Sequence, residues 1–301
     1  MMYSVLKTIL CYVIILLGVS NLRAQDIQPR VYAPAPVGTN VITLGYTYSY
    51  GALLFDKTIP ITDTDASIHG INAAYSRATK FLGAAGRFDV VLPLVRGFWD
   101  GQVSDLSQST DRFGMADPVI RYAVFIKGAP ALTKEEFSDF EPETIIGLTM
   151  RMQVPLGQYD PDRLINLGTN RWTFSPQIGL WHAFRNFTFE AYAGLWLFTD
   201  NTNFLGATRS QNPLATLQAH VSYAFNNGLW IAASTRQSFG GAVTTGNGER
   251  LDPETNNRVG LSLALPLSKN YVIRLSGTTG LSTTIGNDYT TFGIGCQAVF
   301  W

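Results

Sequence analysis

The sequence predicts an all-β protein: a transmembrane antiparallel up-and-down β-barrel of about twelve strands, preceded by a signal peptide. Three observations support this fold class. Apolar and polar residues alternate over runs of roughly ten residues, the connections between runs alternate between short and long, and the chain ends on Phe300 and Trp301. Strand boundaries inferred from sequence shift by a few residues, so we expect roughly ten to fourteen strands.

Residues 1–24 have the pattern of a secretory signal. Lys7 precedes an apolar run over residues 9–19, and Ala24 closes the segment. The run is shorter than the roughly 20 residues that a spanning helix needs, so we predict cleavage after Ala24. The alternative is an N-terminal membrane anchor. The remaining chain divides into a Pro-rich leader or plug at residues 25–40 and a barrel at residues 41–301, placed in the outer membrane of a Gram-negative-type bacterium.

The composition favours a lipid-facing surface over a water-facing one. Charged residues make up 15% of the chain, against about 25% in ordinary soluble domains. A protein with so few charges would cover a water-facing surface poorly, whereas the outer wall of a barrel faces lipid. The net charge is zero and no basic block is present, so we expect no nucleic-acid partner. Cys296, the one cysteine outside the signal, allows no intrachain disulfide.

Each run has a wholly apolar face and a face that carries charge. Between residues 86 and 94, Phe88 and Val90 point one way, while Arg87 and Asp89 point the other. In a barrel these faces meet lipid and lumen; in a sandwich they meet core and water, so alternation alone does not separate the two. The candidate lumen-lining residues are Arg87, Asp89, Asp117, Arg121, Arg151, Glu190, Arg236, Arg258 and Arg274.

These inward charges have two interpretations. They line a permeation path, or they form a salt-bridge network inside a barrel that is closed to solutes. Buried unpaired charge costs several kcal/mol, so in a narrow barrel the charges must be paired or hydrated. Arginines outnumber acids in this set, which would favour anionic solutes if the lumen is open.

The connections give the barrel an orientation. Short turns are expected at 185–186, 226–228 and 269–270, and long loops near 51–67, 96–111, 156–170, 199–213, 240–256 and 281–288. Outer-membrane barrels have short periplasmic turns and long external loops, so both termini are placed in the periplasm. The link from Lys127 to Glu141 is long although it lies on the turn side, and we predict a short surface helix there.

The terminal aromatic pair is the feature that barrel-assembly machinery is expected to recognise, through Phe300 and Trp301. If Phe300 faces lipid, Phe292 and Ile294 share its face; if Trp301 does, the polar Gln297 joins it. We favour the frame with Phe300 outward. The other expected partners are outer-membrane lipid and a small-molecule solute whose identity the sequence does not give, and the barrel is expected to be a monomer.

Prolines govern the segment before the first strand. Pro29, Pro34 and Pro36 exclude pairing as an interior strand. Either the segment enters the barrel as a plug, or it covers the periplasmic rim as a leader. The candidate plug residues are Arg30, Tyr32, Pro34 and Pro36.

No set of residues supports catalysis, a cofactor or a metal. His220 and Ser222 stand two apart, a spacing that resembles the outer-membrane phospholipase arrangement, but here both point into the lumen and only Gln237 is offered by the facing strand. Loop carboxylates at 160–162 and 252–254 could bind calcium, although solvated loop charge explains them better. We therefore predict that the protein is not an enzyme and holds neither cofactor nor metal.

Several segments resemble one family over nearly the whole mature chain. They are RVYAPAPVGTN at 30–40, GYTYS at 45–49, GRFDVVLP at 86–93, GMADP at 114–118, PLGQYD at 155–160 and NLGTNRW at 166–172. They resemble the outer-membrane transporter-like family named for the meta-pathway of phenol degradation. That resemblance implies a barrel and a role in taking up aromatic or hydrophobic compounds.

The expected function is passive transport of small solutes, with aromatic or hydrophobic ones foremost, across the outer membrane. One alternative is a structural or receptor barrel with a closed lumen. The second alternative is a soluble secreted β-sandwich.

Overall fold

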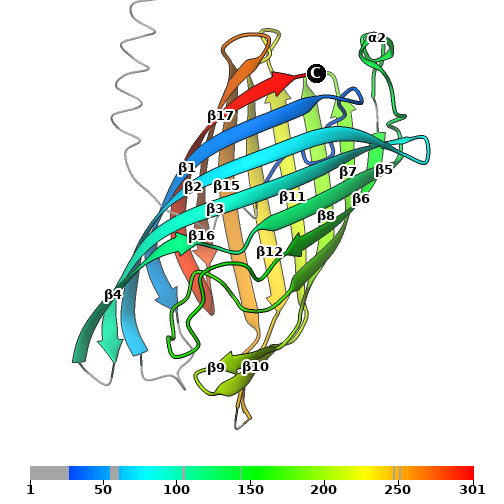
Figure 1. Cartoon of the computed structure of the whole chain (residues 1–301). Helices are drawn as coiled ribbons and strands as arrows, with labels where there is room; N and C mark the ends of the chain where they lie inside the picture. Colours follow the sequence, from blue (N-terminus) through cyan, green and yellow to red (C-terminus); the bar gives the residue numbers. More distant parts are fainter. Residues whose placement is uncertain (1–26, 55–60, 104–105, 143, 247, 251) are drawn as a thin grey trace, which may run out of the picture.

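The computed structural model describes residues 27–301 except 55–60, 104–105, 143, 247 and 251, so the predicted signal peptide at 1–24 lies outside the described residues. An antiparallel sheet curls into a tall barrel (Figure 1). Its strands are β1 (Asn40–Leu54), β2 (Ile61–Phe81), β3 (Ala84–Val103), β4 (Leu106–Met115), β5 (Val119–Lys127), β6 (Thr144–Gln153), β7 (Thr173–Phe184), β8 (Phe187–Phe198), β11 (Leu214–Ala224), β12 (Trp230–Gly240), β15 (Glu254–Pro266), β16 (Tyr271–Ser282) and β17 (Gly286–Phe300).

The sheet closes through pairing of its first and last strands. β1 pairs with β2 on one side and with β17 on the other, in a register that sets Asn40 opposite Phe300. Apart from β4 and β5, which both pair with β3, barrel strands that follow each other in sequence are neighbours around the wall, as in an up-and-down barrel. The predicted fold class is confirmed, and the soluble sandwich is excluded.

The wall separates the two faces of each strand. On β1, Ile42, Leu44 and Tyr46 point outward and are 51%, 59% and 43% exposed, while Thr43 and Thr47 point inward. A soluble sandwich would bury this apolar set in its core. Here it forms the surface that lipid covers, which removes the cost of exposing it to water.

In the last strand, β17, Phe300 faces outward, as predicted. Phe300 and Ile294 are exposed on the outer face, whereas the Gln297 side chain donates a hydrogen bond from Nε2 to Thr43 Oγ1 (3.1 Å) on the inner face. Trp301 follows the strand, and the Lys134 ammonium lies 4.4 Å from its ring centroid.

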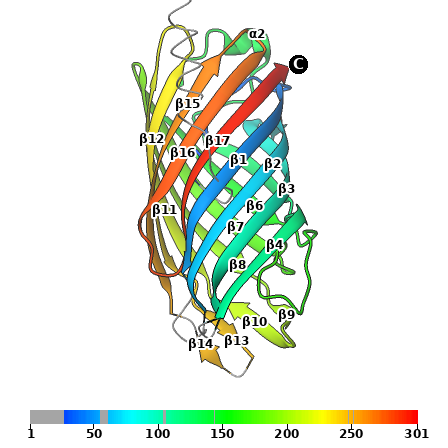
Figure 2. The ribbon, with the colours of Figure 1, turned by 90° about the vertical axis from the view of Figure 1, so that its left-hand side faces the viewer.

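Two of the expected long loops are instead mostly strand. β1 and β2 extend into the stretch 51–67, and β3 and β4 into 96–111. In these extensions the backbone pairing continues, although polar and apolar residues no longer alternate. The loops at 199–213 and 240–256 also differ from the prediction, because they contain a small second sheet at the end of the barrel opposite the C-terminus (Figure 2). Its strands are β9 (Asn201–Phe204), β10 (Ala207–Gln211), β13 (Val243–Thr245) and β14 (Glu249–Arg250).

Alternation of apolar and polar residues over 113–126 predicts one strand, but the structure has two, β4 and β5, separated at Ala116-Asp117-Pro118. Pro118 has no backbone N–H to donate to a neighbouring strand. β5 pairs with both β3 and β6, but β4 pairs only with β3 among the described strands. The outer edge of β4 therefore meets the loop at 154–172 instead of a strand.

The long link at 127–141 contains the predicted short helix, α2 (Lys134–Phe137). Thr133 caps it and forms a capping box with Glu136. The Thr133 backbone N–H donates to the Glu136 carboxylate (2.8 Å) and holds the pKa of that group below its usual value. In the described part of the chain, no helix has the length and apolarity needed to cross a membrane.

Candidate functional site

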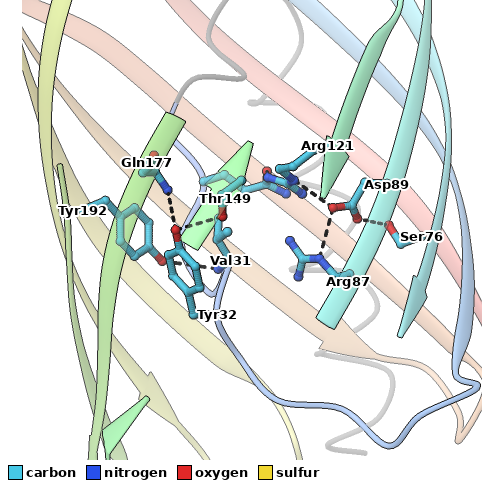
Figure 3. Close-up of polar contacts among 10 residues, drawn as sticks. Val31, Tyr32, Ser76, Arg87, Asp89, Arg121, Thr149, Gln177 and Tyr192 are labelled. Atoms are coloured by element: carbon cyan, nitrogen blue, oxygen red, sulfur yellow. Dashed lines mark hydrogen bonds and ion pairs between the residues drawn. The ribbon is translucent and has the colours of Figure 1, made fainter. Parts of the chain in front are cut away.

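Residues 27–32, which we call the plug, lie inside the barrel, and Tyr32 is its anchor (Figure 3). The Tyr32 side chain is fully buried. Its ring lies over Gly147 of β6 and Gly179 of β7, where an added Cβ would come within 2.2 and 1.9 Å of ring atoms. The Tyr192 ring packs against it edge-on at 5.1 Å. Two glycines on adjacent strands thus form a slot for one aromatic ring.

Hydrogen bonds hold the plug to the β6–β8 side of the wall. Thr149 Oγ1 (2.9 Å) and Gln177 Nε2 (3.1 Å) donate to the Tyr32 hydroxyl oxygen. The Arg30 backbone N–H donates to both carboxylate oxygens of Glu190 at 2.8 and 3.0 Å. The Glu190 carboxylate therefore binds the backbone of the plug. Hydrogen bonds to a charged acceptor are among the stronger ones.

A second attachment runs from the plug to β3 and β5. Asp89 accepts from Arg121 Nε (2.8 Å), Arg87 Nε (3.2 Å) and Ser76 Oγ (2.5 Å). Arg121 also donates from Nη1 to Gln28 Oε1 of the plug (2.9 Å). One inward carboxylate thus organises two guanidiniums, and one of these reaches the plug (Figure 3).

Inward arginines elsewhere stack on tryptophans. Arg30 and Arg274 lie 5.3 and 5.0 Å from the Trp230 ring centroid. Arg151 and Arg236 lie 4.7 and 5.9 Å from that of Trp196. Distances below about 6 Å are within the range of cation–π attraction.

A second constriction lies at the level of β4. The loop at 154–172 folds inward, and its Leu167 is buried in an apolar cluster with Val95, Trp99 and Tyr289 of the inner wall. Asp117 ties this loop to the break between β4 and β5. Its carboxylate accepts the backbone N–H groups of Gly157 (2.9 Å) and Thr169 (2.8 Å), the Thr169 hydroxyl (2.6 Å) and Gln153 Nε2 (3.1 Å).

The predicted site residues fall into three groups. Asp117 was expected on the inner face of a strand, but it lies in the strand break, where it bonds the loop instead of lining the lumen. Pro34 and Pro36 lie after the plug, on the stretch that reaches the link at 127–141 through the Val37 N–H bond to the Leu132 carbonyl. The residues on the inner side are Arg30, Tyr32, Arg87, Asp89, Arg121, Arg151, Glu190, Arg236, Arg258 and Arg274.

Sequence reasoning missed the partners that complete the site. Tyr192, Trp230 and Leu167 carry no pattern that distinguishes them from other barrel aromatics and loop apolars. Gly147 and Gly179 carry a weak signal, because both lie inside apolar runs where glycine lowers strand propensity and often marks a close approach.

The histidine–serine pair does not form a catalytic arrangement. His220 Nδ1 is 2.8 Å from Ser234 Oγ on the next strand, not from Ser222. His220 and Ser222 are 2% and 1% exposed. Asp160 of the candidate calcium loops pairs with Arg163 at 2.7 Å, and within the described residues no group of His, Cys, Asp and Glu side chains could hold a metal.

The closed antiparallel barrel with its lipid-facing wall and filled lumen belongs to the class of outer-membrane β-barrels. Residues 34–298 match the family described as "Putative MetA-pathway of phenol degradation", and the chain belongs to that family. The predicted resemblance is confirmed.

Solved structures share the fold. The COG4313 outer membrane channel from Pseudomonas putida F1 matches with a TM-score of 0.78 and 18% identity, covering 91% of this chain and 100% of that one. The KdgM porin matches with a TM-score of 0.47 and 10% identity over 87% of this chain and 99% of that one. The beta domain of the Bordetella autotransporter BrkA gives 0.47 and 13% over 88% and 100%. No curated protein matches the sequence.

Proposed function

We propose that this protein is a passive outer-membrane channel for small aromatic or hydrophobic solutes, which enter the lumen sideways through the break in the wall beside β4. The observation that carries this proposal is the outer edge of β4, which faces the loop at 154–172 where a barrel strand would normally pair. Backbone at membrane depth that is not paired in a sheet must be covered by protein or line a cavity.

Apolar surface lies on both sides of this break. On the outer side, Phe113, Leu156 and Trp172 are 59%, 64% and 41% exposed. On the inner side, the cluster of Leu167, Val95 and Trp99 faces the lumen. A hydrophobic solute dissolved in the membrane would move between these surfaces without crossing a polar wall, once the loop moves aside.

The closed-lumen barrel remains the second candidate, because both the plug and the loop fill space in the lumen. The two candidates differ in whether loop movement admits a solute. A lock on the loop tests this difference directly.

The lock is a disulfide between the loop and β4. A Cβ at Gly114 would lie 3.3 Å from the Gln158 Cβ, close to the roughly 3.5–4.5 Å that disulfides span. We would introduce Gly114→Cys and Gln158→Cys together with Cys296→Ser, and measure uptake of radiolabelled toluene by intact cells in which the protein is assembled. Uptake through the oxidised variant should fall severalfold and recover with reductant, while each single-cysteine variant should match the parent.

Two results would count against the proposal. Equal uptake through oxidised and reduced forms would exclude the sideways route. Uptake no faster than in cells without the protein would exclude the channel and leave the closed barrel.

A further inference from the structure

The part of the lumen around the plug, which we call the plug chamber, has more positive charge than negative. The guanidiniums of Arg30, Arg87 and Arg121 lie close enough to repel that of Arg274. The carboxylates that face this group belong to Asp89 and Glu190. Charges taken out of bulk water require partners. Which arginines are neutralised therefore depends on which groups these two carboxylates bind.

Both carboxylates have other partners than Arg274. Asp89 is shared between Arg87 and Arg121. Glu190 accepts the backbone N–H of Arg30 and the hydroxyl of Tyr192. The Arg30 Nη1 atom is buried with no hydrogen-bond partner among the described residues. Among the described residues, no carboxylate pairs with the Arg274 guanidinium and no group accepts a hydrogen bond from it; the guanidinium lies against the Trp230 ring.

The wall beside Arg274 is bare. Arg274 lies opposite Gly295, which lies opposite Gly45 on the far side of β17. An added Cβ at Gly45 or Gly295 would meet its nearest atoms at 3.6 and 3.7 Å, an ordinary contact distance. Packing against the wall does not require glycine at either position. Because these two glycines have no side chains, space is left on the inner face next to the Arg274 guanidinium.

We propose that the plug chamber binds the carboxylate of a small amphipathic anion between Arg30 and Arg274. Both guanidiniums are positioned by the Trp230 ring, and a planar fork of N–H donors matches a carboxylate. The apolar body of the ligand would lie along the bare wall of Gly45 and Gly295. This inference rests on the proposed function, to which it adds a preference for aromatic or alkyl carboxylates over neutral hydrocarbons.

The test measures binding of 4-fluorobenzoate to the purified full-length barrel in detergent micelles by fluorine NMR. 4-Fluorobenzyl alcohol, which is neutral and of similar size, is the matched probe. Arg274→Gln removes the charge and Arg274→Lys keeps it. Arg96→Gln is the control, because Arg96 lies on the outer face with an exposed side chain paired to Asp111 at 3.5 Å. Heat-modifiable migration on gels verifies that each variant is folded.

The wild type should bind the benzoate at least tenfold more tightly than the alcohol. Arg274→Gln should weaken benzoate binding by about tenfold, which is 1.4 kcal/mol, with Arg274→Lys intermediate and Arg96→Gln unchanged. Equal binding of the two probes by the wild type, or equal benzoate binding by wild type and Arg274→Gln, would overturn the proposal. Toluene uptake by the Arg274→Gln variant separates the two ideas: normal uptake with no benzoate preference rejects only this inference.

Discussion

Tyr32 is held in the lumen by shape as well as by hydrogen bonds. Its ring occupies the space that side chains at Gly147 and Gly179 would fill. Packing at interior density leaves no room for an added methyl group unless the ring moves. The plug position therefore depends on the absence of side chains at Gly147 and Gly179.

Substitution of Gly179 should release the plug. In Gly179→Ala the new methyl would lie 1.9 Å from the Tyr32 ring, so the ring must leave the slot and Arg30 becomes accessible. We expect trypsin to cleave the purified barrel after Arg30 at least tenfold faster than in the wild type, measured by mass spectrometry. Gly45→Ala is the control, because its methyl meets only ordinary contacts. Unchanged protection of Arg30 in Gly179→Ala would contradict this account.

The stretch 113–126 forms two strands, β4 and β5, because the pairing is interrupted at Pro118. Alternation over 113–126 predicts one strand, but the phase of the alternation changes at the break. Phe113 and Met115 face outward on β4, whereas Ile120 and Tyr122 face outward on β5. Pro118 and the inward loop interrupt the pairing. A proline within a strand pattern indicates an edge or an interruption of the strand. The loop that occupies the edge of β4 lies some forty residues further along the chain, so local sequence does not reveal it.

Asp117→Asn should loosen the loop without unfolding the barrel. Asp117 accepts four hydrogen bonds at the break, and an amide has one acceptor oxygen in place of two. Each lost bond to a charged group costs about 1.5–3 kcal/mol. Tryptic cleavage after Arg163, an exposed loop residue, should accelerate at least tenfold, while the heat-modifiable migration of the barrel stays unchanged.

Asp111→Asn is the matched control for that experiment. Asp111 lies on β4, but its carboxylate is exposed and pairs with Arg96 across 3.5 Å, where ion pairs contribute little. If both variants are cleaved at the wild-type rate, the carboxylate of Asp117 does not hold the loop.

The lumen of the complete barrel is narrowed at two levels. The plug closes the level of Tyr32 and the loop at 154–172 closes the level of Leu167. Strand pairing closes the wall between β1 and β17, and the plug takes no part in that pairing. Barrels near twelve strands lie between those filled by side chains and water-filled porins, so these two segments determine how wide the path is.

Deletion of residues 27–32 should therefore widen the path and leave the barrel folded. We expect single-channel conductance in planar bilayers to rise severalfold over the wild type, with unchanged heat-modifiable migration. Tyr50→Ala, at an exposed outer position, should conduct like the wild type. A deletion variant with wild-type conductance would show that another segment limits the path.

The class of fold, the lipid-facing and lumen-facing sets and the outward frame of Phe300 followed from alternation, because a two-residue period assigns every side chain of a strand to one of two faces. Recognition of Phe300 and Trp301 by assembly machinery stays a prediction. The seat of Tyr32, the pairing of Glu190 with the plug backbone and the unpaired edge of β4 depended on three-dimensional closure. Closing the sheet brings residue 30 beside residue 190 and residue 117 beside residue 169, and no local pattern records contacts over such separations.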